Sequence, residues 1–168
     1  SSPRTSSGIA AASLPALART AAEVSSRGDY SLRARQSTSA ASASDSLIGI
    51  TTIHFKVLET IQSVSFDLAT ERPNKKGMFV TQVKDATASL AYQHENNQVK
   101  INLPQPVNQG EEKTLSIYYR GIPADGLIIA KNKYNRRTFF ADNWPNRAHH
   151  WLACIDHPSD KAKVEFVV

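Results

Sequence analysis

Apolar and polar residues alternate with a period of two along most of the chain after residue 46. This alternation is typical of β-strands that have one face in a core and the other in water. Residues that favour turns, such as Gly, Pro and Asn, separate the alternating segments roughly every eight to twelve residues. The pattern predicts about nine strands, at residues 48–58, 64–68, 78–83, 87–94, 98–103, 114–119, 127–130, 138–140 and 161–168. A break is expected at residues 104–110, where two prolines occur. The fold class that follows is all-β, an antiparallel β-sandwich or a saddle-like arrangement of layered sheets.

One stretch near the C-terminus departs from this period. From Trp144 to Ile155 the apolar residues fall at helical spacing, with Asn143 before the first of them and Pro145 early in the stretch. This predicts one short helix or distorted turn. A large aromatic side chain at such a spacing belongs more often to a core than to a ligand site, so we expect Trp151 to be buried where this turn packs on the sheet.

Residues 1–46 have a different composition. They consist mostly of Ser, Thr and Ala, and contain five arginines, three acidic residues, no lysine and one aromatic residue. Such a segment has little apolar surface to bury, so a disordered tail is predicted at 1–46 and a folded domain at 47–168. The Arg-rich and Ser-rich composition also suits the remnant of a transit peptide or of an export signal, and we slightly favour an exported protein over a cytoplasmic one. The apolar run at residues 9–18 is too short to span a membrane, so no membrane span is expected.

The charge of the chain does not favour a nucleic-acid partner. The net charge is +5, and the excess is scattered along the sequence. Only Lys131–Arg137 combines clustered basic residues with an aromatic residue. We interpret that segment as a basic hairpin loop in water and expect no nucleic-acid binding.

Side chains that could bind a metal do not form a recognisable pattern. Cys154 is the single cysteine and is expected to be a small buried residue. His149 and His150 are adjacent, so on a helix they point about 100° apart and cannot easily bind one ion together. The chain contains no His-Glu-x-x-His motif. We therefore predict no catalytic residue, no metal site and no cofactor in this chain.

The terminal stretch from Thr138 to Val168, with its aromatic strand, its Asp156-His-Pro-Ser-Asp160 turn and the strand after it, resembles one place in a known enzyme family. The resemblance is to the N-terminal β-domain of the aminopeptidase N family of zinc metallopeptidases, where this stretch leads into the peptidase domain. Weaker similarity covers residues 47–168. The opening strand that is customary in the family is missing from residues 47–168, and Ala153 replaces the usual proline.

The resemblance implies a role for the loop before the turn. In the family, the N-terminal domain supplies a Gln or Glu that binds the amine of the substrate. Counting back from Asp156, that position falls on Trp144, with Asp142 and Asn143 beside it. These three residues are the candidate substrate-binding residues, and Trp144 is expected to be partly exposed. An indole ring cannot replace a carboxylate, but its face can bind a cation.

The implied function is that of a non-catalytic N-terminal domain, present as a fragment of a zinc aminopeptidase-like metallopeptidase. Its implied partners are the catalytic peptidase domain and, in the full-length enzyme, a peptide substrate. The zinc belongs to that other domain, and we expect this chain alone to be inactive as a peptidase. The alternative is a stand-alone β-sandwich that binds protein or carbohydrate through exposed aromatics, either Tyr118 with Tyr119 or Phe139 with Phe140. Because neighbouring residues on a strand point to opposite faces, we expect at most one of each pair to be exposed.

Overall fold

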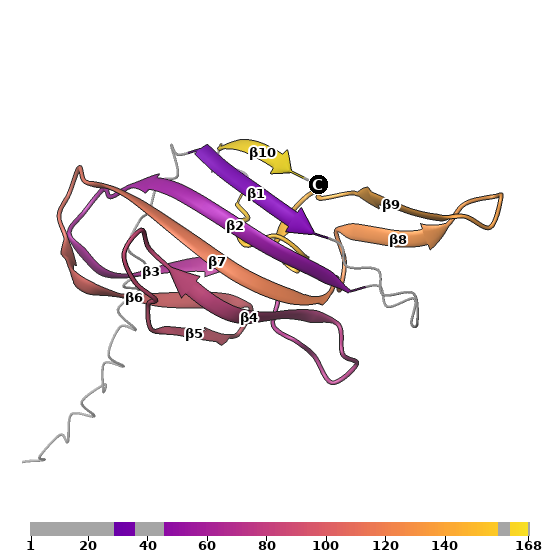
Figure 1. Ribbon diagram of the computed structural model, residues 1–168, viewed down its shortest axis with the longest axis horizontal. Helices are drawn as coiled ribbons and strands as arrows, with labels where there is room; N and C mark the ends of the chain where they lie inside the picture. Colours follow the sequence, from indigo (N-terminus) through magenta and orange to yellow (C-terminus); the bar gives the residue numbers. More distant parts are fainter. Residues whose placement is uncertain (1–28, 36–45, 158–161, 168) are drawn as a thin grey trace, which may run out of the picture.

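Ten strands and one 3-10 helix form the part of the chain that the structure, a computed structural model, describes: residues 29–35, 46–157 and 162–167. For residues 29–35 and 167 the backbone alone is described. The elements are β1 Asp29–Arg35, β2 Leu47–Lys56, β3 Ile61–Asp67, β4 Gly77–Lys84, β5 Tyr92–Glu95, β6 Gln98–Val107, β7 Glu112–Ile122, β8 Leu127–Lys131, β9 Arg137–Ala141, η1 Ala148–His150 and β10 Lys163–Val167. They form a five-stranded sheet in the order β10-β1-β2-β7-β4, a three-stranded sheet β3-β6-β5 and a two-stranded sheet β8-β9 (Figure 1).

The long strands β2 and β7 form the centre of the five-stranded sheet. Alternate residues of β2 are buried, as the period of two predicts. One of these inward positions is Gly49, which pairs with Tyr119 of β7. A side chain at Gly49 would lie 2.6 Å from the Tyr119 ring, so glycine leaves the space that the ring fills. The buried Tyr119 hydroxyl lies 3.0 Å from Thr51 Oγ1, and burial raises the pKa of this phenol.

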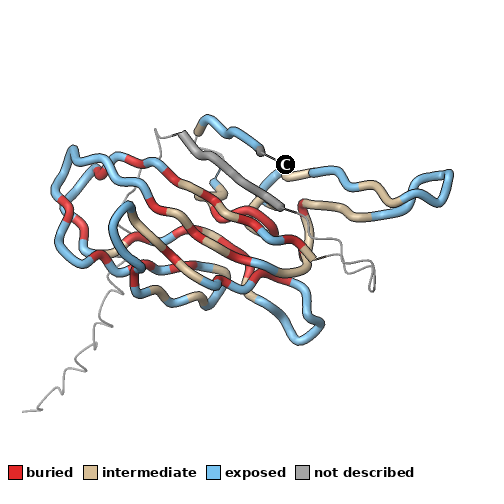
Figure 2. Tube along the Cα trace, viewed as in Figure 1, coloured by how far each residue is buried: buried red, intermediate tan, exposed pale blue. Residues whose placement is uncertain are grey.

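The three-stranded sheet packs on the inner face of the five-stranded sheet. A single apolar cluster joins the inward residues of β2, β4 and β7 to those of β3 and β6. Phe55 of β2 and Phe66 of β3 meet edge to face, with ring centroids 5.9 Å apart. The buried positions in Figure 2 follow the strands of these two sheets. The predicted all-β sandwich of antiparallel sheets is therefore confirmed, and among the paired strands of the described residues β1 and β10 alone run parallel.

Each of the nine predicted strands has a counterpart among the described residues, but the bounds differ, most at β5, which begins at Tyr92 instead of residue 87, and at β6. β6 continues through the predicted break to Val107 and includes Pro104 and Pro106. Its register with β3 shifts between Ile61 and Ser63, where Val107 and Asn102 are their partners. The prolines lie within this irregular part, where missing amide protons cost no regular ladder bond. The short helix or distorted turn predicted within Trp144–Ile155 is confirmed as η1, a single 3-10 turn.

The strand β1 corrects the predicted domain boundary. It lies at residues 29–35, inside the segment that composition predicts to be a disordered tail, and it pairs with both β2 and β10. The folded domain therefore begins earlier than residue 47, and the opening strand that seemed to be missing has a counterpart here. The rest of the predicted tail, residues 1–28 and 36–45, lies outside the described residues. No helix among the described residues is long and apolar enough to cross a membrane.

Candidate functional site

The three candidate residues Asp142, Asn143 and Trp144 lie in the loop that follows β9. The backbone of this loop is fixed at both ends. The Asp142 amide donates to the Gly126 carbonyl at 2.7 Å, and the Arg147 amide donates to the Asn143 carbonyl at 3.0 Å. Gly126 has a φ of +75°, and a Cβ there would lie 2.2 Å from the Arg147 carbonyl oxygen. Glycine is thus required both by the backbone conformation and by the close approach of the loop.

Arg147 organises the loop from within. Its Nε donates to the Trp144 carbonyl at 2.6 Å, and its Nη2 donates to Asp142 Oδ2 at 3.0 Å. Its Nη1 also lies 3.6 Å from Asp125 Oδ1, at the turn before β8. The guanidinium therefore joins the two ends of the β8–β9 hairpin to the loop through bonds of the charge-assisted kind. The pKa of Asp125 is lowered, first by the hydrogen bond from the Gly126 amide and also by the charge of Arg147.

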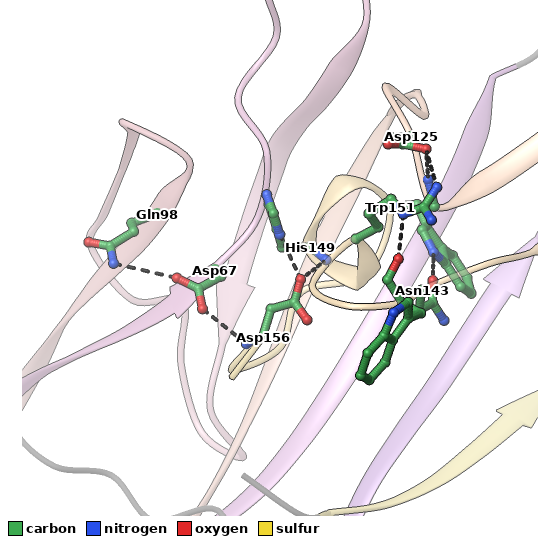
Figure 3. Close-up of polar contacts among 10 residues, drawn as sticks. Asp67, Gln98, Asp125, Asn143, His149, Trp151 and Asp156 are labelled. Atoms are coloured by element: carbon green, nitrogen blue, oxygen red, sulfur yellow. Dashed lines mark hydrogen bonds and ion pairs between the residues drawn. The ribbon is translucent and has the colours of Figure 1, made fainter. Parts of the chain in front are cut away.

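Asn143 faces inward. Its Oδ1 accepts a hydrogen bond from Trp151 Nε1 at 2.9 Å (Figure 3). Trp151 is 6% exposed, and its ring stacks on Phe166 of β10 with centroids 6.0 Å apart. The prediction that Trp151 is buried is therefore confirmed. Asn143 satisfies the indole N–H of a core side chain, and its amide oxygen is committed to that contact.

Trp144 faces outward and is 77% exposed. It is exposed as predicted, and more fully than the partial exposure that was expected. Of the three candidate side chains it is the most exposed: Asp142 is bonded to Arg147 and half-exposed, and Asn143 is bonded to Trp151. The structure therefore brings the three residues into one loop but gives them different surroundings. A fixed loop with an exposed indole ring can offer a preformed apolar and cation-binding surface.

A second polar cluster joins η1 and the residues that follow it to β3. The Asp156 Oδ2 atom accepts hydrogen bonds from the His149 amide at 3.1 Å and from His149 Nδ1 at 2.7 Å. The Asp156 amide donates to Asp67 Oδ2 at 3.0 Å, and Gln98 Nε2 donates to Asp67 Oδ1 at 3.4 Å (Figure 3). Asp67 and Cys154 also pair through their main chains. These contacts attach the chain after η1 to the end of β3.

This cluster accounts for part of the predicted turn. Asp156, the first residue of the Asp156–Asp160 turn, binds the backbone amide of His149, whereas residues 158–161 lie outside the described residues. Because a carboxylate can only accept, the short contact assigns the His149 proton to Nδ1. Neither Asp67 nor Arg147 was identified from the sequence. The sequence gives only one hint of the role of Asp67: it is a polar residue at the end of β3, an alternating segment.

The histidines near the loop do not form a metal site. The rings of His149 and His150 lie against each other, with centroids 4.2 Å apart and planes tilted by 33°. Burial, and then the neighbouring His149, lower the pKa of His150. Within the described ranges no three His, Cys, Asp or Glu side chains come together in a way that could hold a metal ion. The described residues therefore do not fit a zinc site, and no chemical step of this chain is derived through zinc.

Comparison with known proteins identifies the family. The family model described as the Peptidase M1 N-terminal domain matches residues 28–168. The chain belongs to this family. The match begins next to β1 and so includes the strand that composition had assigned to the tail. Zinc metallopeptidases of the M1 family are thus the class in which this domain occurs, as the sequence resemblance implied.

Solved structures with this M1 N-terminal fold include the M1 zinc metallopeptidase from Deinococcus radiodurans. It is 24% identical, with a TM-score of 0.64, over 82% of this chain and 30% of that chain. A mutant of a two-domain M1 zinc metallopeptidase bound to L-tryptophan is 24% identical, with a TM-score of 0.63, over 85% and 33%. At this identity the likeness shows the fold alone. The chain spans about a third of the length of these enzymes. No curated protein matches the chain by sequence.

Proposed function

We propose that this chain is the non-catalytic N-terminal domain of a zinc aminopeptidase-like metallopeptidase, in which the loop Asp142–Trp144 shapes the pocket for the amino terminus of a peptide substrate. The observation that carries the proposal is the exposure of Trp144 in a loop where Asp142 is bonded to Arg147 and Asn143 to Trp151. Membership of the M1 N-terminal domain family supports the parent enzyme class and a catalytic domain as partner.

The contacts of the loop give each residue a distinct part in this pocket. Trp144 presents an aromatic face, which attracts an ammonium group by about 0.5 to 2 kcal/mol. Asp142 adds a carboxylate that is half-exposed and is held in place by Arg147. Asn143 acts as a positioning residue, because its amide oxygen is bonded to Trp151 and keeps the loop against the core. The zinc and the attacking water belong to the catalytic domain, so this domain contributes binding and orientation of the substrate.

The test is steady-state kinetics of the full-length parent enzyme on aminoacyl p-nitroanilides. Replacing Trp144 by Ala should raise KM by about 2- to 30-fold, the range that a lost cation–π contact corresponds to, with a smaller change in kcat. Trp144→Phe should recover part of the loss, since a weaker aromatic face remains. The matched control is Phe79→Ala, because Phe79 is also an exposed aromatic, at 55%, on a different element, β4. Equal KM values for the wild type and Trp144→Ala would refute the pocket assignment.

This 168-residue chain alone should not hydrolyse these substrates, because no zinc-binding cluster can be assigned to its described residues. The measurement is the same assay with added zinc, together with metal analysis after dialysis. Hydrolysis by the isolated chain, or one zinc ion retained per chain, would contradict the division of roles proposed here.

A further inference from the structure

The β8–β9 hairpin has exposed aromatic side chains on both faces. Phe139 is 53% exposed and Phe140 is 55% exposed. Their register partners are Ile129 and Ile128 of β8, so one phenylalanine and one isoleucine lie on each face. The expectation that at most one of Phe139 and Phe140 would be exposed is therefore wrong. It assumed a strand with a covered face, whereas no residue from Leu127 to Ala141 is buried.

The hairpin is set apart from the sandwich. It extends away from the two larger sheets, and its tube in Figure 2 shows only exposed and intermediate positions. In the described part of the chain, β8 and β9 pair only with each other, so each has an outer edge without a neighbouring strand. A two-stranded hairpin by itself is marginally stable in water. Apolar faces on such a hairpin indicate a surface that another part of a protein covers.

The charge of the hairpin specifies the kind of surface it fits. Residues 127–141 contain two lysines and two arginines and no acidic residue. Tyr134 at the tip is exposed too, and Lys133 Nζ lies 5.0 Å from the centre of its ring. At the root, β8 and residues 122–125 line a hollow of about 220 Å³ that is open to solvent. A complementary partner therefore has an apolar groove with carboxylates at its rim.

The base of the hairpin is connected to β10, the last described strand. Asn143 follows β9 by two residues and accepts the hydrogen bond of Trp151, whose ring stacks on Phe166 of β10. The last described strand thus lies against the same side chain that fixes the end of the hairpin. Enzymes with this N-terminal fold are about three times as long as the chain. In such a protein the region after β10 starts close to the base of the hairpin.

We propose that the β8–β9 hairpin, Leu127–Ala141, is a docking arm that enters an apolar, acid-rimmed groove of the peptidase domain of the parent protein. This inference rests on the proposed function, since it takes the peptidase domain as the partner. Beyond the proposed function, the inference names the hairpin as the surface that binds the peptidase domain. It also states that the receiving groove is apolar with acidic residues at its rim. Docking of the arm also fixes the loop Asp142–Arg147, because Arg147 and Gly126 join that loop to the base of the hairpin.

Hydrogen exchange of the 168-residue chain and of the full-length parent protein tests the arm directly. The amides of residues 127–141 should exchange at least about tenfold more slowly in the full-length protein, while those of β2 and β7 change little. The double variant Phe139→Ser/Phe140→Ser should remove this protection and leave the melting temperature of the 168-residue chain nearly unchanged, because both side chains are exposed in it. Phe79→Ser, an equally exposed aromatic on β4, is the control and should keep the protection.

A charge variant tests the acid rim without changing the apolar faces. Lys131→Glu/Arg136→Glu should also lower the protection of the arm in the full-length protein, and raising the salt concentration should weaken the wild-type protection in the same way. The two residues are exposed in the domain, so its own fold should tolerate both changes.

Three results would overturn the proposal. One is equal exchange of residues 127–141 in the two proteins. Another is unchanged protection in the Phe139→Ser/Phe140→Ser variant. The third is a dimer of the 168-residue chain in sedimentation that the same variant dissolves, because the arm would then bind a second copy. None of these readouts uses enzyme activity. A protected arm together with an unchanged KM in Trp144→Ala would refute the pocket and leave the docking arm standing.

Discussion

Replacing each of the two tryptophans by alanine in the 168-residue chain should have very different effects on stability. Trp151 is almost completely covered, so Trp151→Ala removes close to the whole contact area of its side chain, on the order of 200 Å². At about 25 cal/mol per Å² this corresponds to a loss of roughly 5 kcal/mol, at the upper end of the 3–5 kcal/mol or so measured for such truncations. For Trp144, about a quarter of whose surface is covered, the same arithmetic gives about 1 kcal/mol.

The assay is urea unfolding followed by far-UV circular dichroism. Since the chain has two tryptophans, each single variant also leaves one fluorescent reporter, Trp144 in water or Trp151 in the core. A loss of 5 kcal/mol can unfold a domain of ordinary stability altogether. Trp151→Phe is therefore the second variant: it keeps most of the packing, leaves Asn143 Oδ1 without its donor, and should cost about 1 to 3 kcal/mol. Phe79→Ala is the control for truncating an exposed aromatic.

The result that would refute this reasoning is equal destabilisation by Trp144→Ala and Trp151→Ala. Trp144 would then be a core residue, and its assignment to a substrate pocket would lose its structural basis. A Trp151→Phe variant as stable as the wild type would show instead that the Asn143 contact does not hold the loop.

Two further predictions concern the loop and the histidines. Gly126→Ala should destabilise the domain by at least about 2 kcal/mol more than Gly110→Ala in urea melts, because both have positive φ but a Cβ clashes with the Arg147 carbonyl only at Gly126; similar losses for both would contradict the clash. Stability should also fall as the pH decreases below about 6.5, because burial lowers the folded-state pKa of His94 and His150 and the unfolded chain then binds more protons. His94→Gln and His150→Gln should each flatten this decline, and a stability that rises on acidification would show the opposite shift.

The sequence predicted the strands because their signal is local. A period of two is visible within one segment, and it marked all nine strands after residue 46. β1 was missed because Asp29–Arg35 lies in a segment whose average composition is that of a disordered chain. Its partners are β2 and, from the far end of the chain, β10. The pairing of β1 with β10 joins segments far apart in the sequence, so it cannot be detected from the local alternation of residues that predicts strands.

The short helix or distorted turn predicted at Trp144–Ile155 is present as the single turn η1, and the contacts around it explain why it is not longer. The spacing of Trp144, Trp151 and Leu152 fits a helix, but the Trp144 carbonyl accepts from the Arg147 side chain. The turn bonds that follow, from His150 to Arg147 and from Trp151 to Ala148, span three residues and form η1. A side chain has thus taken the place of a helical amide as the donor to that carbonyl. Spacing alone cannot distinguish these two ways of satisfying it.

The loop Asp142–Trp144 was located by counting residues back from the Asp156 turn. The structure explains physically why the residue reached by this count, Trp144, lies on the surface. Arg147 and Asn143 both direct their bonds inward, one to the backbone of Trp144 and one to Trp151. With those bonds made, Trp144 is left outside while Trp151 fills the core under β10. The contacts that hold the loop therefore also connect the end of the hairpin to β10, the last described strand. In a parent enzyme that binds the hairpin and continues from β10, Trp144 would be held in place through both the hairpin and β10.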